Sequence, residues 1–363
     1  MNRNRISSSA WFIFCCFTQL SRLLDWQFCE ALALQLSRSP SKYERSFFSD
    51  AASIFGVKDG LKKRHPSSIV IEIHRNDDKF VWFADVLSAI NRANSQPFCL
   101  FQRRVAKSEQ LLIINFVEIM EHILGDTVDL QVDDYSGCAV IVGIQTKIAP
   151  ATEAVVSQNS AIGSTMEWVD EILVKKGVCP YTKSVAESGQ GLRELGVVPG
   201  KVMYLHHQTN SITRLLEDYC RAASRFLSEN GWSSILLVAP FFNDRFDDWL
   251  LLFDGLEAIA ISVGESDKIG NVCFHPLYQT PSLWRSFGHL PSLPRLKQFW
   301  LDEEGEGMPI YSEAEMERAA WRMRQTPHAT INCLYSADLA AAEKKRVSRS
   351  LYTSNIKMLM SSD

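Results

Sequence analysis

The chain lacks the features by which several classes of protein are usually recognised. Its 38 Lys and Arg residues do not outnumber its 42 Asp and Glu residues, so the charge balance gives no reason to expect a nucleic acid as partner. The apolar run at residues 10–17 is too short to span a bilayer, and we expect no integral membrane segment. No metal, nucleotide or catalytic-triad signature is present, which leaves cofactor and reaction unknown.

Paired cysteines are also missing. The nine cysteines are odd in number, scattered, and include no C-x-x-C pair of the kind that binds zinc or forms a redox couple. Several lie in apolar runs, where a free cysteine behaves as a small hydrophobic residue. We predict reduced thiols in a reducing compartment. The cysteines are Cys15, Cys16, Cys29, Cys99, Cys138, Cys179, Cys220, Cys273 and Cys333.

The composition that is present, 46% hydrophobic and 22% charged over 363 residues, is typical of a soluble globular protein with room for two domains. Residues 1–66 begin with Arg3, Arg5 and a serine run, continue into the apolar run, and stay rich in Ser and Arg. This pattern is typical of a transit peptide for a mitochondrion or plastid. A disordered linker in a cytoplasmic protein is the alternative, and both stay open.

Hydrophobic periodicity predicts an α/β protein with two globular parts. Residues 67–147 form a small α/β domain, and a weakly polar segment at 148–164 separates it from a second domain at 165–360. In the small domain we expect strands at 68–73, 98–102, 127–132 and 137–144, and helices at 80–93 and from Ser108 to Leu124. In the second we expect strands at 202–207, 233–240, 269–275 and 330–335, and helices at 166–177, 211–230, 243–264 and 312–324, with Ser336 beginning the last ones.

The second domain is predicted to contain a mostly parallel sheet of about four strands flanked by helices. Two consecutive crossovers through long helices favour parallel strands with right-handed connections. Ser211 and either Asn243 or Asp244 are expected to cap the crossover helices, and Ser312 with Glu315 to form a capping box. Ligands of such sheets bind at the carboxyl ends of the strands.

Polar residues follow three of these strands, so that edge of the sheet is the candidate site. Pro276 stops the third strand and leaves His275 and Tyr278 at its exit. His206 and Asn243 follow the first two strands, and helix N-termini opening there favour an anion. We therefore expect a small anionic ligand, with His206, Asn243 and Arg324 as anion-binding residues and no metal.

Each candidate has a competing structural interpretation. His275 is either a general acid/base or a histidine that hydrogen-bonds a backbone carbonyl at the strand exit. Cys179, close in sequence to basic residues, is either a nucleophile with a depressed pKa or a packed thiol. Arg324 either clamps a carboxylate or phosphate or complements the dipole of its helix. Of His206 and the adjacent His207, only one can face a given side of the sheet.

Three separated motifs resemble a known family. They are the helix followed by Cys179-Pro180-Tyr181, the strand ending in the run from Phe274 to Tyr278, and the closing run from Arg324 to Leu334 with a helix at Asn355 after it. Together they resemble domain of unknown function family 1415 over roughly residues 165–360. The resemblance implies that Cys179, His275, Tyr278 and Arg324 are signature positions. The chain departs from the family pattern in its long link at 279–311.

Two functional hypotheses follow. The first is an enzyme that acts on a small anionic metabolite at the carboxyl edge of the C-terminal sheet, with His275, Cys179 and Tyr278 as catalytic residues. The second is a small-ligand-binding or regulatory module without catalysis at the same edge. They differ in whether the side chains of Cys179 and His275 approach within hydrogen-bond reach.

Overall fold

A computed structural model describes residues 57–279 and 312–360. Within these ranges, the residues at 75, 94–95, 104–106, 126–127, 136–137, 146–156, 180 and 345–347 are not described. The predicted transit peptide up to residue 56 and nearly all of the long link at 279–311 therefore lie outside the described residues.

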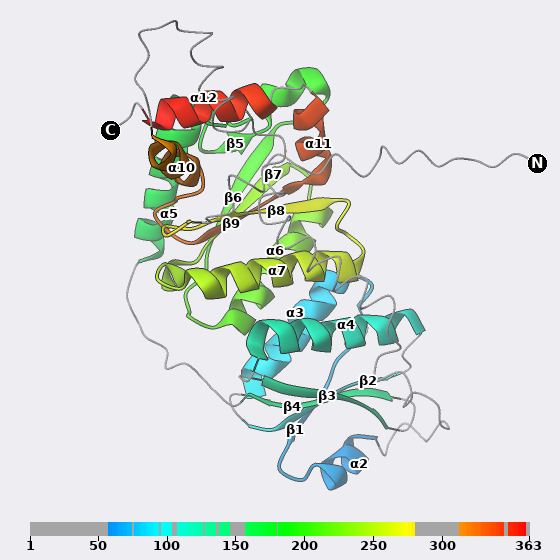
Figure 1. The fold of residues 1–363 in the computed structure, drawn as a ribbon. Helices are drawn as coiled ribbons and strands as arrows, with labels where there is room; N and C mark the ends of the chain where they lie inside the picture. Colours follow the sequence, from blue (N-terminus) through cyan, green and yellow to red (C-terminus); the bar gives the residue numbers. More distant parts are fainter. Residues whose placement is uncertain are drawn as a thin grey trace, which may run out of the picture.

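The first α/β unit is a four-stranded sheet, here called sheet A, with the strand order β1-β2-β4-β3. Its strands are β1 (Ile69–Glu72), β2 (Phe98–Arg103), β3 (Val128–Tyr135) and β4 (Cys138–Gln145). The β1–β2 pair is parallel and the other two pairs are antiparallel. Helices α3 (Lys79–Ala93) and α4 (Lys107–Leu124) cover one face, and α2 (Val57–Arg64) covers the other (Figure 1).

Helix α2 lies inside the segment predicted to be a linker. Its side chain Leu61 is 1% exposed and packs with Val70, Cys99 and Phe101 of sheet A. In β2, Cys99 and Phe101 face α2 while Phe98 and Leu100 face the helices on the other side, as the two-residue period of a strand requires. A strand apolar on both faces needs a cover on both.

The second unit is a five-stranded sheet, here called sheet B, with the order β5-β6-β7-β9-β8. Its strands are β5 (Glu187–Ser188), β6 (Gly200–His206), β7 (Trp232–Val238), β8 (Ile269–Phe274) and β9 (Thr330–Tyr335). The α/β class predicted from the sequence is confirmed, but the sheet is mixed. Among the described strands of sheet B, β6 and β7 alone pair in parallel, because β9 lies antiparallel between β7 and β8. Strands β6, β7 and β8 still run in one direction, so their carboxyl ends share an edge.

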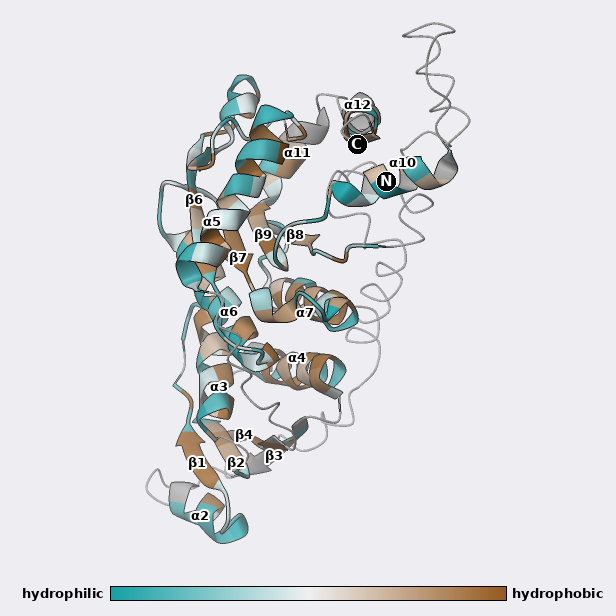
Figure 2. Cartoon of the chain, turned by 90° about the vertical axis from the view of Figure 1, so that its left-hand side faces the viewer, coloured by the Kyte–Doolittle hydropathy of each residue, from teal (hydrophilic) through white to brown (hydrophobic). Residues whose placement is uncertain are grey.

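Helices cover both faces of sheet B (Figures 1 and 2). The crossover helices α6 (Ile212–Ser228) and α7 (Phe246–Val263) lie on the face toward sheet A. The other face carries α5 (Gln158–Trp168), which continues as the π-helix η2 (Val169–Lys175), and α10 (Glu313–Arg322), α11 (Ser336–Lys344) and α12 (Ser348–Met360). Among the described residues, no helix has both the length and the apolar composition needed to cross a membrane.

The predicted helix caps are largely present. Ser211 accepts a hydrogen bond from the N–H of Arg214, and Ser312 with Glu315 forms the expected capping box. Helix α7 is different, because it begins after Arg245 without a side-chain cap. Neither Asn243 nor Asp244 is its cap. Asn243 ends the short 3₁₀ helix η4 (Pro240–Phe242), and its side chain bonds instead to the residues just before β9.

The two α/β units share one hydrophobic core. Helix α3 packs on α6 and α4 packs on α7, so the four helices form a double layer between the sheets (Figure 2). The buried side chains of both units, among them Phe83, Phe116, Leu216 and Trp249, belong to a single contiguous cluster. Gly255 of α7 lies directly against Ile123 of α4. The domains predicted at 67–147 and 165–360 are thus joined by an apolar interface.

Candidate functional site

The carboxyl ends of β6, β7 and β8 and the start of β9 meet at one edge of sheet B, here called the carboxyl edge. The strand order places His206 at the end of β6, Asn243 after β7, His328 before β9 and His275 after β8. Three of these four residues were predicted from the sequence. His328 joins them because β9 runs antiparallel and therefore starts where its neighbours end.

A hydrogen-bond network fixes His328 as a neutral imidazole. Its Nδ1 accepts from the amide Nδ2 of Asn243 at 3.0 Å, so its Nε2–H donates to Ser164 Oγ of α5 at 3.0 Å. The amide oxygen of Asn243 accepts from the N–H of Ala329 at 2.9 Å. Burial lowers the pKa of His328, and the nearby His206 lowers it further. Asn243 thus positions the start of β9 and the ring of His328 together.

His206 differs from every other histidine at this edge. Both of its ring nitrogens are shielded from solvent, and neither has a hydrogen-bond partner among the described residues. Burial lowers its pKa, with a smaller contribution from His207. Because a buried polar atom without a partner costs about 1–3 kcal/mol, such a side chain calls for an explanation in a native fold.

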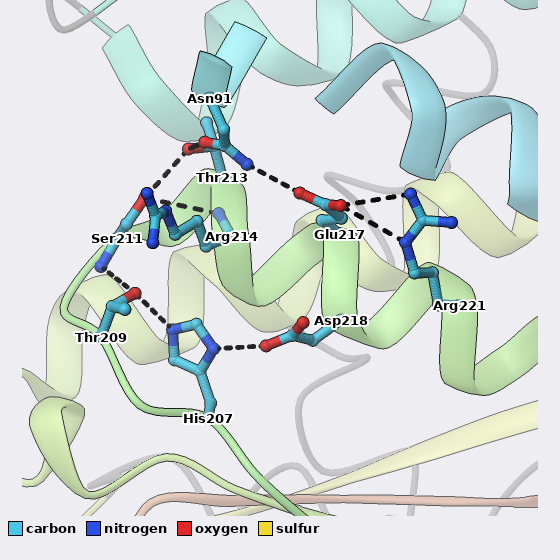
Figure 3. Close-up of polar contacts among 9 residues, drawn as sticks. All are labelled: Asn91, His207, Thr209, Ser211, Thr213, Arg214, Glu217, Asp218 and Arg221. Atoms are coloured by element: carbon cyan, nitrogen blue, oxygen red, sulfur yellow. Dashed lines mark hydrogen bonds and ion pairs between the residues drawn. The ribbon is translucent and has the colours of Figure 1, made fainter. Parts of the chain in front are cut away.

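His207 faces the other side of the sheet and lies in a chain of polar contacts (Figure 3). Its ring is 1% exposed. The Nδ1–H donates to Asp218 Oδ2 of α6 at 2.7 Å, and Nε2 accepts from the hydroxyl of Thr209 at 3.1 Å. A carboxylate, an imidazole and a hydroxyl in this order are the arrangement that activates a nucleophile in hydrolases. The same contacts also hold the β6–α6 connection in place.

The polar chain continues from the start of α6 into the first α/β unit (Figure 3). Thr209 Oγ1 accepts from the N–H of Ser211, whose hydroxyl lies 3.0 Å from that of Thr213. Thr213 donates to the amide oxygen of Asn91 of α3, and that amide donates in turn to Glu217 at 3.0 Å. The amino end of α6 is therefore positioned by both units.

Both ring nitrogens of His275 form hydrogen bonds with the backbone. It is 0% exposed, its Nε2–H donates to the carbonyl of Phe242 at 2.8 Å, and its Nδ1 accepts from the N–H of Leu277 at 3.0 Å. Burial lowers the pKa of the imidazole, although the Phe242 carbonyl and the charge of Asp244 oppose this. The ring is held neutral, and its geometry corresponds to the structural interpretation, in which it secures the strand exit.

Tyr278 and Arg324 lie beside His275 and are also buried, at 3% and 4% exposure. The ring of Tyr278 packs edge-on against Phe246 at 5.6 Å between centroids. Arg324 donates from Nη1 to the carbonyl of Cys273 at 3.1 Å, and its guanidinium lies 5.7 Å from the ring centroid of Phe274. Tyr278 and Arg324, both predicted as site residues, therefore lie next to the end of β8.

Cys179 lies on the opposite face of sheet B from His275. It lines a cavity of about 80 Å³ together with Trp168 and Phe274, whereas His275 packs against Phe246 and Trp249 of α7. Because successive side chains of a strand point to opposite faces, Phe274 and His275 cannot face the same space. Cys179 Sγ accepts from Thr182 Oγ1 at 3.6 Å. The structure does not bring the proposed nucleophile and the proposed base together.

The environment of Cys179 also opposes a depressed pKa. Burial raises the pKa of its thiol, and the hydrogen bond from Thr182 and the charge of Lys183 offset this only in part. We expect iodoacetamide at pH 7.5 to alkylate Cys179 at least about tenfold more slowly in the folded protein than in urea, because the thiolate is the reacting form. Peptide mass spectrometry measures this rate, and faster reaction in the folded state would contradict the assignment.

The cavity beside Cys179, here called the sheet-face cavity, is mostly apolar. Most of its polar groups are already paired within the protein: Ser234 donates to the amide oxygen of Asn332 at 2.9 Å, and Tyr204 donates to the carbonyl of Val185 at 2.8 Å. Across the part of the chain that the structure describes, no three His, Cys, Asp or Glu side chains form a group suited to a metal ion.

Of three comparisons with known proteins, one gave a match, and that match is to a family model. No match was found among curated proteins or among solved structures. The model of the family DUF1415, described as a protein of unknown function, matches residues 160–282. This range starts in α5 and ends just after β8, so it includes Cys179, His206, His275 and Tyr278 but not the run that begins at Arg324. Residues 160–282 of this chain therefore resemble DUF1415, as the motifs predicted.

Proposed function

We propose that the chain binds a small anionic metabolite at the carboxyl edge of sheet B, on the face covered by α5. The single observation that carries this proposal is His206, whose two ring nitrogens are buried and have no hydrogen-bond partner among the described residues. Asn243, after β7, and His328, just before β9, lie at the same edge and would border the same ligand.

The chemistry of His206 favours an anion whose binding is accompanied by uptake of a proton on the imidazole. A neutral imidazole offers one N–H donor and one lone pair, whereas the imidazolium offers two donors to a carboxylate or phosphate. His328 cannot take this role without breaking its bond from Asn243, because its Nδ1 is an acceptor there. The proton is therefore expected on His206, whose low pKa would rise when the anion binds.

The arrangement supports binding more than it supports catalysis by the predicted residues. His275 has both ring nitrogens bonded to the backbone, and Cys179 lies across the sheet with a raised pKa. Neither is placed to exchange a proton with a ligand beside His206. We therefore propose binding of a small ligand without catalysis.

Calorimetric titration of inorganic phosphate and of acetate at pH 6.5 tests the proposal. We expect at least one anion to bind with proton uptake, seen as a heat that changes with the ionisation enthalpy of the buffer. His206→Gln should weaken that binding at least about tenfold, the loss expected for a charge-assisted hydrogen bond. His74→Gln, at an exposed histidine, is the matched control. Equal affinity in the protein and in His206→Gln would contradict the proposal.

An enzyme is the second candidate, and the polar chain Asp218–His207–Thr209 favours it. In that case a ligand co-purified with the protein, detected by native mass spectrometry, would be released chemically altered after incubation. Thr209→Ser should preserve the change and Thr209→Val should abolish it, because only the hydroxyl can donate to His207 and then react. A ligand recovered unaltered supports binding alone.

A further inference from the structure

A second pocket lies at the opposite end of sheet B, where β6 and β7 begin and β9 ends. We call it the amino-edge pocket. Its volume is about 660 Å³, which is large enough for a small metabolite. It is distinct from the carboxyl edge, and it uses none of the residues discussed there. Its lining residues include Val197, Gly200, Asn230, Trp232, Tyr335 and Asp338.

Asp338 is the one charged side chain among the described residues that line this pocket. It also lines the sheet-face cavity, and among the described residues it is the one charged side chain there too. It belongs to the first turn of α11, is half-buried, and forms no hydrogen bond or ion pair with the described residues. Two hollows of different size therefore adjoin a single unpaired carboxylate.

The ionised carboxylate of Asp338 destabilises the folded protein. Burial raises the pKa of Asp338 to about 6. The positive end of the α11 dipole favours an acid in the first turn, yet desolvation outweighs this contribution. A group whose charge is disfavoured in the free protein gains most from a partner of opposite charge.

The remaining lining fits an organic cation. The rings of Trp232 and Tyr335 border the amino-edge pocket beside Asp338. The Arg225 guanidinium lies over one face of Trp232, and Tyr335 stacks on Phe226, so an ammonium group in the pocket would meet the opposite faces of these rings. The sheet-face cavity on the other side is bordered mainly by apolar side chains such as Leu236, Val272 and Leu339. An ammonium group at Asp338 would therefore have aromatic rings on one side and space for a short alkyl chain on the other.

We infer that the amino-edge pocket binds a small organic cation, a primary ammonium with a short apolar chain, and that Asp338 is its anchor. The site does not depend on the proposed anion site, since the two lie at opposite edges of sheet B. A single carboxylate in a lining without basic side chains rejects anions, so the two edges differ in the charge that they accept.

Titration of the full chain with n-butylammonium at pH 7.5, followed by calorimetry, tests the inference. We expect saturable one-to-one binding. The neutral analogue n-butanol should bind at least about tenfold more weakly, and butyrate should not bind to this pocket, because the charged hydrogen bond to the carboxylate is lost. Equal affinity for n-butanol, or no binding of n-butylammonium, would overturn the inference.

Asp338→Asn keeps the shape of the side chain and removes its charge. We expect it to lose at least about tenfold in affinity for n-butylammonium, while Glu167→Gln, at an exposed acid of α5, binds as the unchanged protein does. The thermal midpoint of Asp338→Asn at pH 8 should equal or exceed that of the unchanged protein, which shows that the fold persists. Unchanged affinity in Asp338→Asn would overturn the inference.

The affinity of the pocket for the cation is expected to depend on pH. The cation binds the ionised carboxylate, so affinity should fall as pH falls through about 6, and binding near that pH should release a proton. Phenols and a thiol also face the two hollows, from Tyr335, Tyr204, Tyr181 and Cys179, but none of them gains a charge between pH 5 and 7. The charged residues of the 3₁₀ helix η3 (Gln190–Leu195) beside α11 are exposed and do not line the pockets.

His206→Gln separates this site from the anion site. It should leave n-butylammonium binding unchanged, because His206 lines neither hollow. Loss of cation binding in His206→Gln would show that the two edges are not independent and would overturn the inference as stated.

Discussion

His275→Ala is expected to lower the free energy of unfolding by about 3 kcal/mol, because it leaves the Phe242 carbonyl without its donor and opens a cavity beside Trp249. Urea denaturation followed by circular dichroism measures the change. A histidine that served only in catalysis would leave the midpoint unchanged on the same substitution.

Two further variants make the His275 experiment specific. His275→Asn retains an acceptor close to the position of Nδ1, so it should keep the bond from Leu277 and lose less stability than His275→Ala. His74→Ala, at an exposed histidine, should change the free energy of unfolding by less than about 0.5 kcal/mol. Equal stability of all three variants would refute the structural role.

Gly255→Leu is expected to destabilise the whole chain by about 3 kcal/mol, since α7 meets α4 at this glycine. A Cβ placed on Gly255 would lie 2.0 Å from Cδ1 and 2.6 Å from Cγ1 of Ile123. Either the Ile123 side chain must leave its present rotamer or the two helices must separate to admit a larger side chain. Because this contact belongs to the core shared by both α/β units, hydrogen exchange should show β2 and β7 losing protection together.

Gly163→Ala is the matched control for Gly255→Leu. Gly163 lies inside α5, has ordinary helical backbone angles, and nothing lies within 4 Å of a Cβ built on it. Alanine should therefore stabilise the helix by about 0.5–1 kcal/mol. Independent unfolding of the two sheets in Gly255→Leu would mean that the shared core does not couple them.

The helices and strands could be predicted from the sequence because each carries its own periodicity. In α6 the apolar residues Leu215, Tyr219 and Phe226 recur at helical spacing, and they form the buried face. Ser211 and Ser312 were predicted as caps from local spacing, and both have that role. These features depend on contacts within a few residues, which is the range over which a sequence pattern is informative.

The order of strands in sheet B depends on longer-range contacts. Two helical crossovers correctly imply that β6, β7 and β8 run in one direction, but nothing local to β9 shows that it returns between β7 and β8. That insertion brings His328 to the carboxyl edge and gives the Asn243 side chain partners just before β9 instead of a capping role. The error in the α7 cap and the missed histidine therefore have one cause.

The candidate site, too, could be predicted only where its residues depend on local sequence. Placing His206 and Asn243 at the carboxyl edge required only the direction of the strands. Separating Cys179 from His275 required the face on which each lies, and this depends on how the loop at Cys179 folds back over the sheet. Asp338 carries no local signal beyond an acid in the first turn of a helix. That it forms no ion pair with the described residues, and that burial raises its pKa, is visible only in the folded protein.

The position of β9 also has a consequence for synthesis of the chain. Strands β7 and β8 are made first, and residues 275–329 must follow before the strand that joins them exists. Until Tyr335 has left the ribosome, β7 and β8 each present an open edge of the kind that pairs with other chains. A nonsense mutation before Thr330 is therefore expected to act through aggregation of the nascent product, with newly made chains accumulating in the insoluble fraction.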